Sequence, residues 1–548
     1  MKIGNLYIAL ALAFLSLQCD DIGHLALDST GGFRYLIKDR DPWSMRLGGT
    51  NSDRVNSITF DRSGNIIVAG SVTDGADLDG SRTLDNFTES IGPYNFQGND
   101  IFISKFDPSG AHQWSKRLGG TVTDEALQVA SDSENNIVAV GQITIDADLN
   151  GDGDTTDPWE APAGVHGEYD IFISKFDSSG THLWAIRLGG TGGDAARGVT
   201  VDHEDSIIVT GFMDDAADLN GDGDTTDPGE TQEDIHGEKD IFISKFNSSG
   251  DPQWAKRLGG SYTDRGCSIA HDNENNIIVT GHINRNVDLN GDYVSSSLVT
   301  GERSETFQES DDIFIAKFDS LSGELAWARR LGGGLIDNAY HVSVDRYDDI
   351  VLIGRVYGST DLNASGVIDT GLPEDPSDSC YGGSDIVIAK FDSQGNHLWA
   401  RRLGGSENDE GHGLAVDGSG AVFVTGMVTG NADLNGNGSS DDGGAEDEGV
   451  YGGGDVFIAK FSRHGDPLWS KRLGSSSYLP FEDLEDMGLG ITVNGSGDLI
   501  IGGYVNGESD LNGDGDFDDE YETITSGVHG DDDAFFTVFP NNYFLFLP

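Results

Sequence analysis

Cysteine is scarce in this chain, which has 3 among 548 residues. Cys267 and Cys380 fall in different repeats and in different kinds of element, and Cys19 lies near the N-terminus. A disulfide-stapled fold is not indicated, because such folds need several cysteines at short, regular spacings. We expect Cys267 to be a small buried residue in a strand.

Basic residues are few: 33 Lys and Arg stand against 94 Asp and Glu, for a formal net charge of -61. A surface of that charge repels phosphate backbones, so nucleic acid is not expected as a partner. The acidic side chains then have two interpretations. They form a solvated surface or, where their spacing suits it, they bind divalent cations.

Helical periodicity and catalytic motifs are also lacking. We find no Gly-x-Ser-x-Gly turn, no phosphate-binding glycine loop, no His-Glu-x-x-His and no metal-ligating cysteines. Acidic pairs occur throughout the chain, so none can be singled out for glycoside hydrolysis. The sequence therefore predicts that the protein is not an enzyme.

Glycine, by contrast, is abundant at 78 residues, and the chain carries a repeated unit. One copy, DIFISKFDSSGTHLWAIRLGG, runs from Asp170 to Gly190. Its tryptophan recurs about every 70 residues, a period typical of propeller blades. The recurring tryptophans are Trp43, Trp114, Trp184, Trp254, Trp327, Trp399 and Trp469.

Four strand patterns fill each period. An alternation of small residues such as RGVTVD is followed by an apolar run such as SIIVTG, a long loop, and the two strands of the repeated unit. The chain begins with a fourth strand around Trp43 and ends with a third strand from Asp533 to Phe539. Joining these two would complete one blade and close the ring.

The predicted fold is therefore all-β: a seven-bladed β-propeller of four-stranded antiparallel blades, closed by pairing the N-terminal strand with the C-terminal blade. We place a signal peptide at 1–18, an anchor or linker at 19–40, the propeller at 41–540 and a C-terminal tail at 541–548. The strand at about 41–47 would complete the last blade.

The first residues are typical of an exported protein. Lys2 precedes an apolar run from Leu6 to Leu17, which is too short to span a bilayer, and Cys19 follows. This arrangement resembles a bacterial lipoprotein signal, in a looser form similar to those of spirochaetes. The resemblance implies that Cys19 is lipidated and holds the protein at the outer membrane or cell surface. Plain secretion is the alternative.

Three long loops carry oxygen side chains at alternate positions around glycines, then a further Asp and a Glu. They resemble the first half of an EF-hand or dockerin calcium loop. Carboxylates packed this closely repel unless a cation lies among them, so we expect Ca²⁺ as cofactor; a solvated acidic hairpin is the alternative. The expected ligands are Asp148, Asn150, Asp152, Asp154, Asp157 and Glu160; Asp218, Asn220, Asp222, Asp224, Asp227 and Glu230; and Asp510, Asn512, Asp514, Asp516, Asp519 and Glu522.

The remaining loops fit this pattern less well. The loop at Asp433 lacks the Glu and is a weaker candidate, and those at Asp77, Asp288 and Asp361 have lost too many ligands. His166, His236 and His529 precede the third strand where other repeats have Tyr381, Tyr451 or Phe96, so we expect stacking there and not a histidine metal site.

An arginine precedes Leu-Gly in every repeat: Arg46, Arg117, Arg187, Arg257, Arg330, Arg402 and Arg472. A short turn between the third and fourth strands would set Asp100 opposite Arg117, Asp170 opposite Arg187 and Asp240 opposite Arg257. We predict a structural ion pair in each blade. An arginine ring for anions fits poorly beside so many carboxylates.

The segments DIFISKFDSSG, LW, LGG and IIVTG resemble the SBBP family, named for its β-propeller repeat. The resemblance spans roughly Pro42 to Phe539, and with the Cys19 signal the chain is similar to SBBP-repeat lipoproteins of spirochaetes. It implies a fold and an envelope location but supplies no activity.

We therefore expect a monomeric, lipid-anchored envelope protein that presents a calcium-stabilised propeller face to a protein or glycan, as an adhesin does. One alternative is an envelope scaffold or assembly factor, whose partner is another membrane protein of the same cell. The other is a propeller-type hydrolase or lyase.

Overall fold

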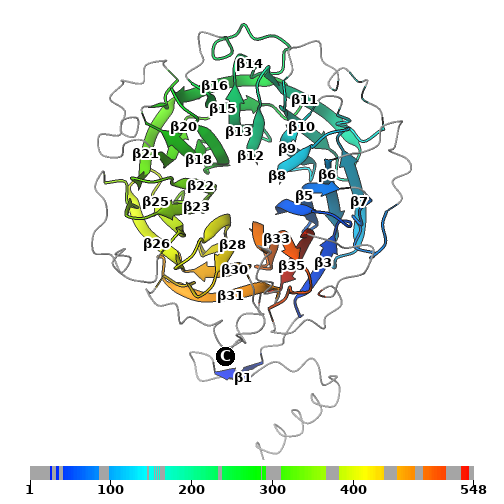
Figure 1. Ribbon diagram of the computed structural model, residues 1–548, viewed down its shortest axis with the longest axis vertical. Coiled ribbons are helices and arrows are strands. Elements are labelled where there is room, and N and C mark those ends of the chain that lie inside the picture. The colour runs from blue at the N-terminus through cyan, green and yellow to red at the C-terminus, as the bar shows by residue number, and fades with distance from the viewer. Residues whose placement is uncertain are drawn as a thin grey trace, which may run out of the picture.

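The computed structural model is a ring of seven sheets around a central axis (Figure 1). It describes residues 41–73, 75–85, 98–144, 147–153, 155, 157, 160, 167–231, 237–285, 287–291, 310–365, 382–436, 453–475, 485–513, 522 and 532–541, and the backbone of 25–27 and 33–35. The seven-bladed all-β fold predicted from the repeats is confirmed.

Each blade is an antiparallel sheet whose main strands follow one another outward from the axis. The first four blades contain β4 (Arg54–Phe60), β5 (Ile66–Thr73), β6 (Asn99–Phe106) and β7 (His112–Leu118); β8 (Glu125–Ser131), β9 (Ile137–Ile143), β10 (Asp170–Phe176) and β11 (His182–Gly190); β12 (Ala195–Val201), β13 (Ile207–Asp214), β15 (Lys239–Phe246) and β16 (Pro252–Gly260); and β17 (Arg265–His271), β18 (Ile277–Asn284), β20 (Asp311–Phe318) and β21 (Leu325–Gly333).

The last three blades follow the same plan. They contain β22 (Asn338–Val344), β23 (Ile350–Tyr357), β25 (Ser384–Phe391) and β26 (His397–Gly405); β27 (Glu410–Val416), β28 (Val422–Thr429), β30 (Gly454–Phe461) and β31 (Pro467–Ser475); and β32 (Met487–Val493), β33 (Leu499–Asn506), β35 (Asp532–Phe539) and β3 (Trp43–Leu47).

The ring closes as predicted, by pairing the two ends of the propeller. β3 lies antiparallel to β35, with Trp43 opposite Val538 and Leu47 opposite Ala534. A buried hydrogen bond of 2.9 Å joins the hydroxyls of Ser44 and Thr537 across the same pair. The N-terminal segment thus supplies the outer strand of the last blade, which completes that blade.

Five blades differ from the prediction by having a fifth, two-residue strand at the outer edge. These strands are β14 (Ala217–Asp218), β19 (Val287–Asp288), β24 (Thr360–Asp361), β29 (Ala432–Asp433) and β34 (Ser509–Asp510). Each comes from the long loop of the following blade; β14, for example, pairs with Gly189 and Gly190 of β11. Counting strand patterns within one repeat missed them, because they are too short to show a pattern and they pair across the blade boundary.

The core lies between successive blades. One cluster combines Val138 and Val140 of one blade with Ile207, Val209 and Phe242 of the next, all fully buried. The third strands are buried on both faces, which explains why DIFISKF is a near-continuous apolar run. Such a strand contributes to two interfaces at once, so its sequence varies little from blade to blade.

Before the propeller, β1 (Leu25–Leu27) and β2 (Phe33–Tyr35) form a short antiparallel pair within the predicted linker. In the part of the chain that the structure describes, no helix is long and apolar enough to cross a membrane.

Candidate functional site

The long loops begin on the outer edge of the ring, and each begins with an aspartate in the same place. Asp218 pairs with Gly189 of the preceding blade, and its Oδ1 accepts the N–H groups of Asn220 at 3.0 Å and Gly221 at 2.6 Å. The equivalent residues Asp77, Asp148, Asp288, Asp361, Asp433 and Asp510 pair in the same way. This aspartate therefore shapes the turn in complete and incomplete loops alike.

The loop at Asp218 has all its predicted ligands among the described residues. Nδ2 of Asn220 donates to Oδ2 of Asp227 at 2.7 Å and to Oδ2 of Asp222 at 3.5 Å. Two carboxylates thus converge on one amide group, as expected at a position suited to a cation. Asp224 does not join them, because its Oδ1 accepts the hydroxyl of Thr226 at 2.6 Å at the exposed tip.

The loop at Asp148 repeats this arrangement. Nδ2 of Asn150 donates to Asp157 at 2.7 Å and to Asp152 at 3.2 Å. In the third loop, Asp510, Asn512 and Glu522 are described. The predicted ligands Asp154, Asp514, Asp516 and Asp519 lie outside the described residues, as do Cys19, Cys380, His166, His236, His529, Phe96, Tyr381 and Tyr451.

The glutamate at the end of each complete loop closes it. Glu230 is 1% exposed, and its carboxylate accepts the N–H groups of Leu219 at 2.9 Å and Asp227 at 3.3 Å. Glu160 and Glu522 accept the equivalent leucine N–H groups. Burial, together with the nearby aspartates, raises the pKa of both Glu160 and Glu230 to about 7. A cation in the loop would favour the charged form of these glutamates.

The loop at Asp77, from which we expected no metal binding, brings three carboxylates together. One oxygen from each of Asp77, Asp79 and Asp85 lies within 4.8 Å of the others. Asp85 accepts the N–H of Leu78 at 2.7 Å, the bond that glutamate makes in the longer loops. Comparison by fixed spacing missed this site, because here the closing acid is an aspartate in a shorter loop.

The predicted arginine–aspartate ion pair is present in every blade. In the blade of β6 and β7, Arg117 lies 2.6 Å from Asp100, with the two side chains 4% and 0% exposed. The register differs from the prediction, because Arg117 lies opposite Phe102 and reaches Asp100 diagonally. The other pairs are Arg46–Asp533, Arg187–Asp170, Arg257–Asp240, Arg330–Asp312, Arg402–Asp385 and Arg472–Asp455.

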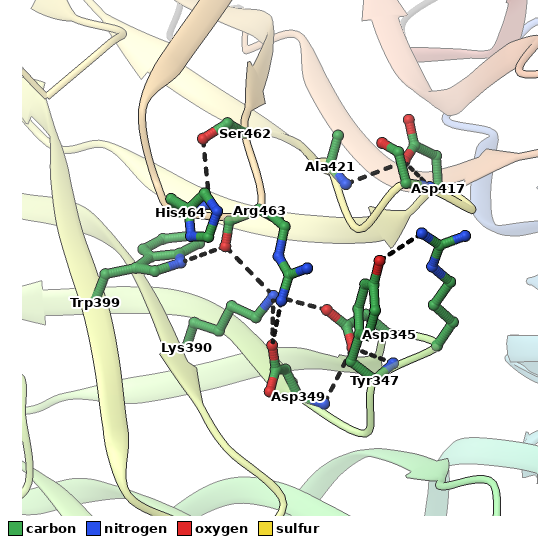
Figure 2. A network of polar contacts seen from close by, with 12 residues as sticks. Asp345, Tyr347, Asp349, Lys390, Trp399, Asp417, Ala421, Ser462, Arg463 and His464 are labelled. Atoms are coloured by element: carbon green, nitrogen blue, oxygen red, sulfur yellow. Dashed lines mark hydrogen bonds and ion pairs between the residues drawn. The ribbon is translucent and has the colours of Figure 1, made fainter.

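A second contact, which we call the inter-blade clamp, was not predicted. Figure 2 shows Lys390 between Asp345 and Asp349, with its Nζ 2.7 Å from the first and 3.3 Å from the second. Lys390 and the indole N–H of Trp399 both donate to the carbonyl oxygen of Arg463 in the next blade. This lysine recurs in DIFISKF and in the equivalent strands, and that recurrence is the sequence signal for the contact.

The clamp also explains the glycine in the turn of the unit. Gly465 lies against the Trp399 ring, where a methyl group would come within 2.7 Å of a ring carbon, and its φ is 82°. Gly180, Gly250, Gly323 and Gly395 meet the tryptophan of the preceding blade in the same way. The unit that recurs most closely along the chain therefore has a structural role, because its residues join successive blades.

Seven buried aspartates, which were not singled out in the sequence, join the end of one blade to the next blade. We call them the corner aspartates. Asp194 accepts the N–H of Gly190 at 2.8 Å and of Asp214 at 2.7 Å, joining the end of one blade's fourth strand to the next blade's second strand. Burial raises the pKa of Asp53, Asp194 and Asp409 to about 7, of Asp124 and Asp486 to about 6, and of Asp337 to about 8. The pKa of Asp264 is raised for the same reason.

The blades differ most at the axis. A cavity of about 500 Å³ is lined by the first strands of all seven blades. Each first strand has a β-bulge at its third residue, and bulges re-aim a side chain. The bulged residues, all lining the cavity, are Asn56, Leu127, Arg197, Cys267, Tyr340, His412 and Leu489. We call them the bulge ring, and their diversity contrasts with the uniform outer strands.

One family model matches part of the chain. Residues 398–435 match the family model of the SBBP β-propeller repeat. The chain is 22% identical over 451 residues to an uncharacterized WD repeat-containing protein of Acanthamoeba polyphaga mimivirus, covering 71% of this chain and 31% of that protein. It is 26% identical over 340 residues to the regulatory protein FlaEY of Caulobacter vibrioides, covering 58% of this chain and 32% of the relative.

The chain thus spans about a third of the length of these curated relatives. Among solved structures, the WD40 domain of Neurospora crassa Pan2 is similar at 9% identity and a TM-score of 0.40, covering 92% of this chain and 97% of that one. The seven sheets and the matched repeat together show that the chain is a seven-bladed β-propeller that carries the SBBP β-propeller repeat.

Proposed function

We propose that the protein is a binding module of the cell envelope, anchored by a lipid on Cys19, whose calcium-binding loops present a protein or glycan ligand site. The observation that carries this proposal is the division of labour between repeated and unrepeated residues. The repeated ones make ion pairs, clamps and corners within the ring. The unrepeated ones lie in the loops and in the bulge ring, which lines the central cavity.

The proposal of calcium rests on two kinds of loop. In the longer loops, carboxylates of Asp222 and Asp227 or of Asp152 and Asp157 converge on an asparagine amide. In the loop at Asp77, three carboxylates approach one another directly. Hard oxygen ligands of this kind suit Ca²⁺, which would offset their mutual repulsion and hold the loops in one conformation.

A non-catalytic role is favoured by the state of the buried thiol and imidazole of Cys267 and His282. Sγ of Cys267 lies 3.9 Å from Nδ1 of His282. Burial raises the pKa of the Cys267 thiol and lowers that of His282 to about 3. Both groups are therefore neutral near pH 7, whereas a nucleophilic cysteine needs the thiolate.

The proposed function is tested by partner capture and glycan-array binding with the mature protein, in calcium and in chelator. The matched control is the triple variant Asp152→Ala, Asp222→Ala, Asp514→Ala, which keeps the ring residues. A partner held by the unaltered protein in calcium, and released both by chelator and by the triple variant, supports the proposal. A partner held equally in all conditions refutes the role of calcium.

Display on the cell needs a separate test. Proteolysis of intact cells should remove the propeller if it faces outward, and replacement of Cys19 by Ser should release it into the medium. Protection from protease favours the scaffold alternative, in which the partner is another envelope protein of the same cell. A soluble, unlipidated protein from unaltered cells excludes the anchor and leaves secretion.

A further inference from the structure

Three cations gather around one aromatic ring, and one of them, Arg197, lines the central cavity. The guanidinium carbons of Arg197 and Arg265 lie 5.5 and 4.9 Å from the centroid of Phe212, and Nζ of Lys239 lies 4.4 Å from it. In a chain of net charge -61, such a cluster of positive charge stands out. The charges also disfavour one another: burial and Arg265 lower the pKa of Lys239, and burial and Arg197 lower that of Arg265.

Within the described residues, none of these three side chains forms an ion pair or a hydrogen bond. Nε of Arg197 and Nε of Arg265 are buried and have no acceptor. Asp214 and Asp311 attract Lys239 and Arg265 only at longer range. A buried donor without an acceptor is costly, so these two arginines lack a partner that buried polar groups ordinarily have.

Two other arginines near the axis, Arg54 and Arg355, each have a carboxylate partner, although Nε of Arg355 is also buried without an acceptor. Arg54 begins the first strand of its blade as Arg265 does, but it lies 3.3 Å from Asp532. Arg355 pairs with Glu410, whose second oxygen lies 3.1 Å from Nε2 of His412. Arg197 and Arg265, in two neighbouring blades, have no carboxylate partner of this kind among the described residues.

The central cavity, which Arg197 lines, suits a small organic molecule. Its volume of about 500 Å³ falls in the range of small-molecule sites. From Arg197 the bulge ring continues with Cys267 and then with Tyr340 and His412, whose rings stack with centroids 4.4 Å apart. Leu127 and Leu489 flank this polar arc, so the cavity offers cations, an aromatic wall and apolar surface together.

We propose that the central cavity binds a small organic anion whose carboxylate, phosphate or sulfate group is held by Arg197 at the cavity wall and by Arg265 and Lys239, which share the Phe212 ring with it. Guanidinium groups form paired, charge-assisted hydrogen bonds with such oxyanions, which would satisfy both arginines. The aromatic and apolar side chains of the bulge ring contact the rest of the molecule. This site requires neither calcium nor a lipid anchor.

Isothermal titration calorimetry of the full chain with inorganic phosphate, sulfate, succinate and glucuronate, at constant chloride, tests the site. We expect at least one of them to bind with a stoichiometry of one, and Arg197→Met and Arg265→Met each to weaken it roughly tenfold or more. The carboxylates and the inorganic anions distinguish the chemistry that is recognised. Arg54→Met is the matched control and should bind as the unaltered protein does.

The proposal is overturned if none of the four anions binds more tightly than chloride, or if Arg54→Met weakens binding as much as Arg197→Met. Should a methionine variant fail to fold, Arg197→Lys serves instead. It keeps the charge but loses the planar fork, so weaker binding at an unchanged melting temperature supports the site. Unchanged binding in that variant contradicts the role given to the guanidinium.

Discussion

Lys390 and Asp345 form an ion pair of 2.7 Å with both side chains 0% exposed. The last blade has Val538 and Asn494 at the equivalent positions, so lysine and aspartate are lost together. Asn494 keeps the turn by accepting the N–H groups of Ser496 and Asp498, as Asp345 does for Tyr347 and Asp349. At the residue scale, the charge of each partner is tolerated because the other is present.

Lys390→Met should therefore lower the free energy of unfolding by about 3–5 kcal/mol, because it leaves a buried carboxylate without its cation. Adding Asp345→Asn to this variant should recover most of the lost free energy of unfolding. The control is Lys460→Met, whose partner Asp417 is 3.6 Å away and whose ion pair is partly exposed, with an expected loss of about 1 kcal/mol or less. Urea denaturation measures all three; equal losses for Lys390→Met and Lys460→Met would contradict the account.

At the scale of strands and turns, the corner aspartates join elements that the repeat places in different blades. Asp337 accepts the N–H groups of Gly333 and Tyr357, and Asp409 those of Gly405 and Thr429. Their raised pKa values mean that the folded state holds protons which the unfolded chain releases near its ordinary pKa of 3.8. Protonation of these aspartates therefore contributes its full stabilisation of the folded state below pH 3.8. This contribution is lost as the pH rises to about 8.

We therefore expect the free energy of unfolding to fall by a few kcal/mol between pH 5 and 8 at constant ionic strength, in the absence of calcium. Asp337→Asn and Asp409→Asn should each flatten this slope. Below about pH 4 the trend should reverse, since hydrogen bonds from a neighbouring asparagine and a lysine lower the pKa of each of Asp61, Asp132 and Asp272. Chemical denaturation across pH provides the curve, and a stability that rises from pH 5 to 8 would count against the corner aspartates as described.

The elements were largely predictable, because burial leaves a direct trace in the sequence. The apolar run of DIFISKF and the alternation of RGVTVD correspond to β10 and β12. The diagonal reach of Arg117 to Asp100, the short strand β14 and the corner bonds of Asp194 were not predictable in this way. These features depend on the strand register and on contacts between neighbouring blades, and the spacing of residues within one repeat does not determine either.

The same limit applied to the candidate sites. Three acidic loops could be found by their shared spacing, but Asp85 closes a loop of different length. Arg197, Cys267 and Tyr340 gave no repeat signal, because a residue that breaks symmetry looks like ordinary variation until the bulges bring the residues around one cavity.

At the scale of the whole molecule, the ring is held by its closure. Arg46 of β3 is 1% exposed and reaches Asp533 of β35 at 2.8 Å, so the last blade depends on a segment from the other end of the propeller. A break at this interface should loosen the whole ring.

Removal of residues 41–47 should lower the melting temperature and promote association, because the edge of β35 is then free to pair with another chain. A synthetic peptide of residues 41–50 should restore the melting temperature and the monomer. Differential scanning calorimetry and light scattering after gel filtration measure both effects. A monomer with an unchanged melting temperature would show that β3 is dispensable.

We propose that calcium holds the loops of this propeller, and the melting temperature tests this proposal most directly. One site stabilises by about 2.7 kcal/mol when free calcium is a hundredfold above its Kd, so several loops should raise the melting temperature clearly. We predict that chelator lowers it and that Asp152→Ala, Asp222→Ala and Asp514→Ala together abolish most of the response. An identical melting temperature in calcium and in chelator would contradict the claim.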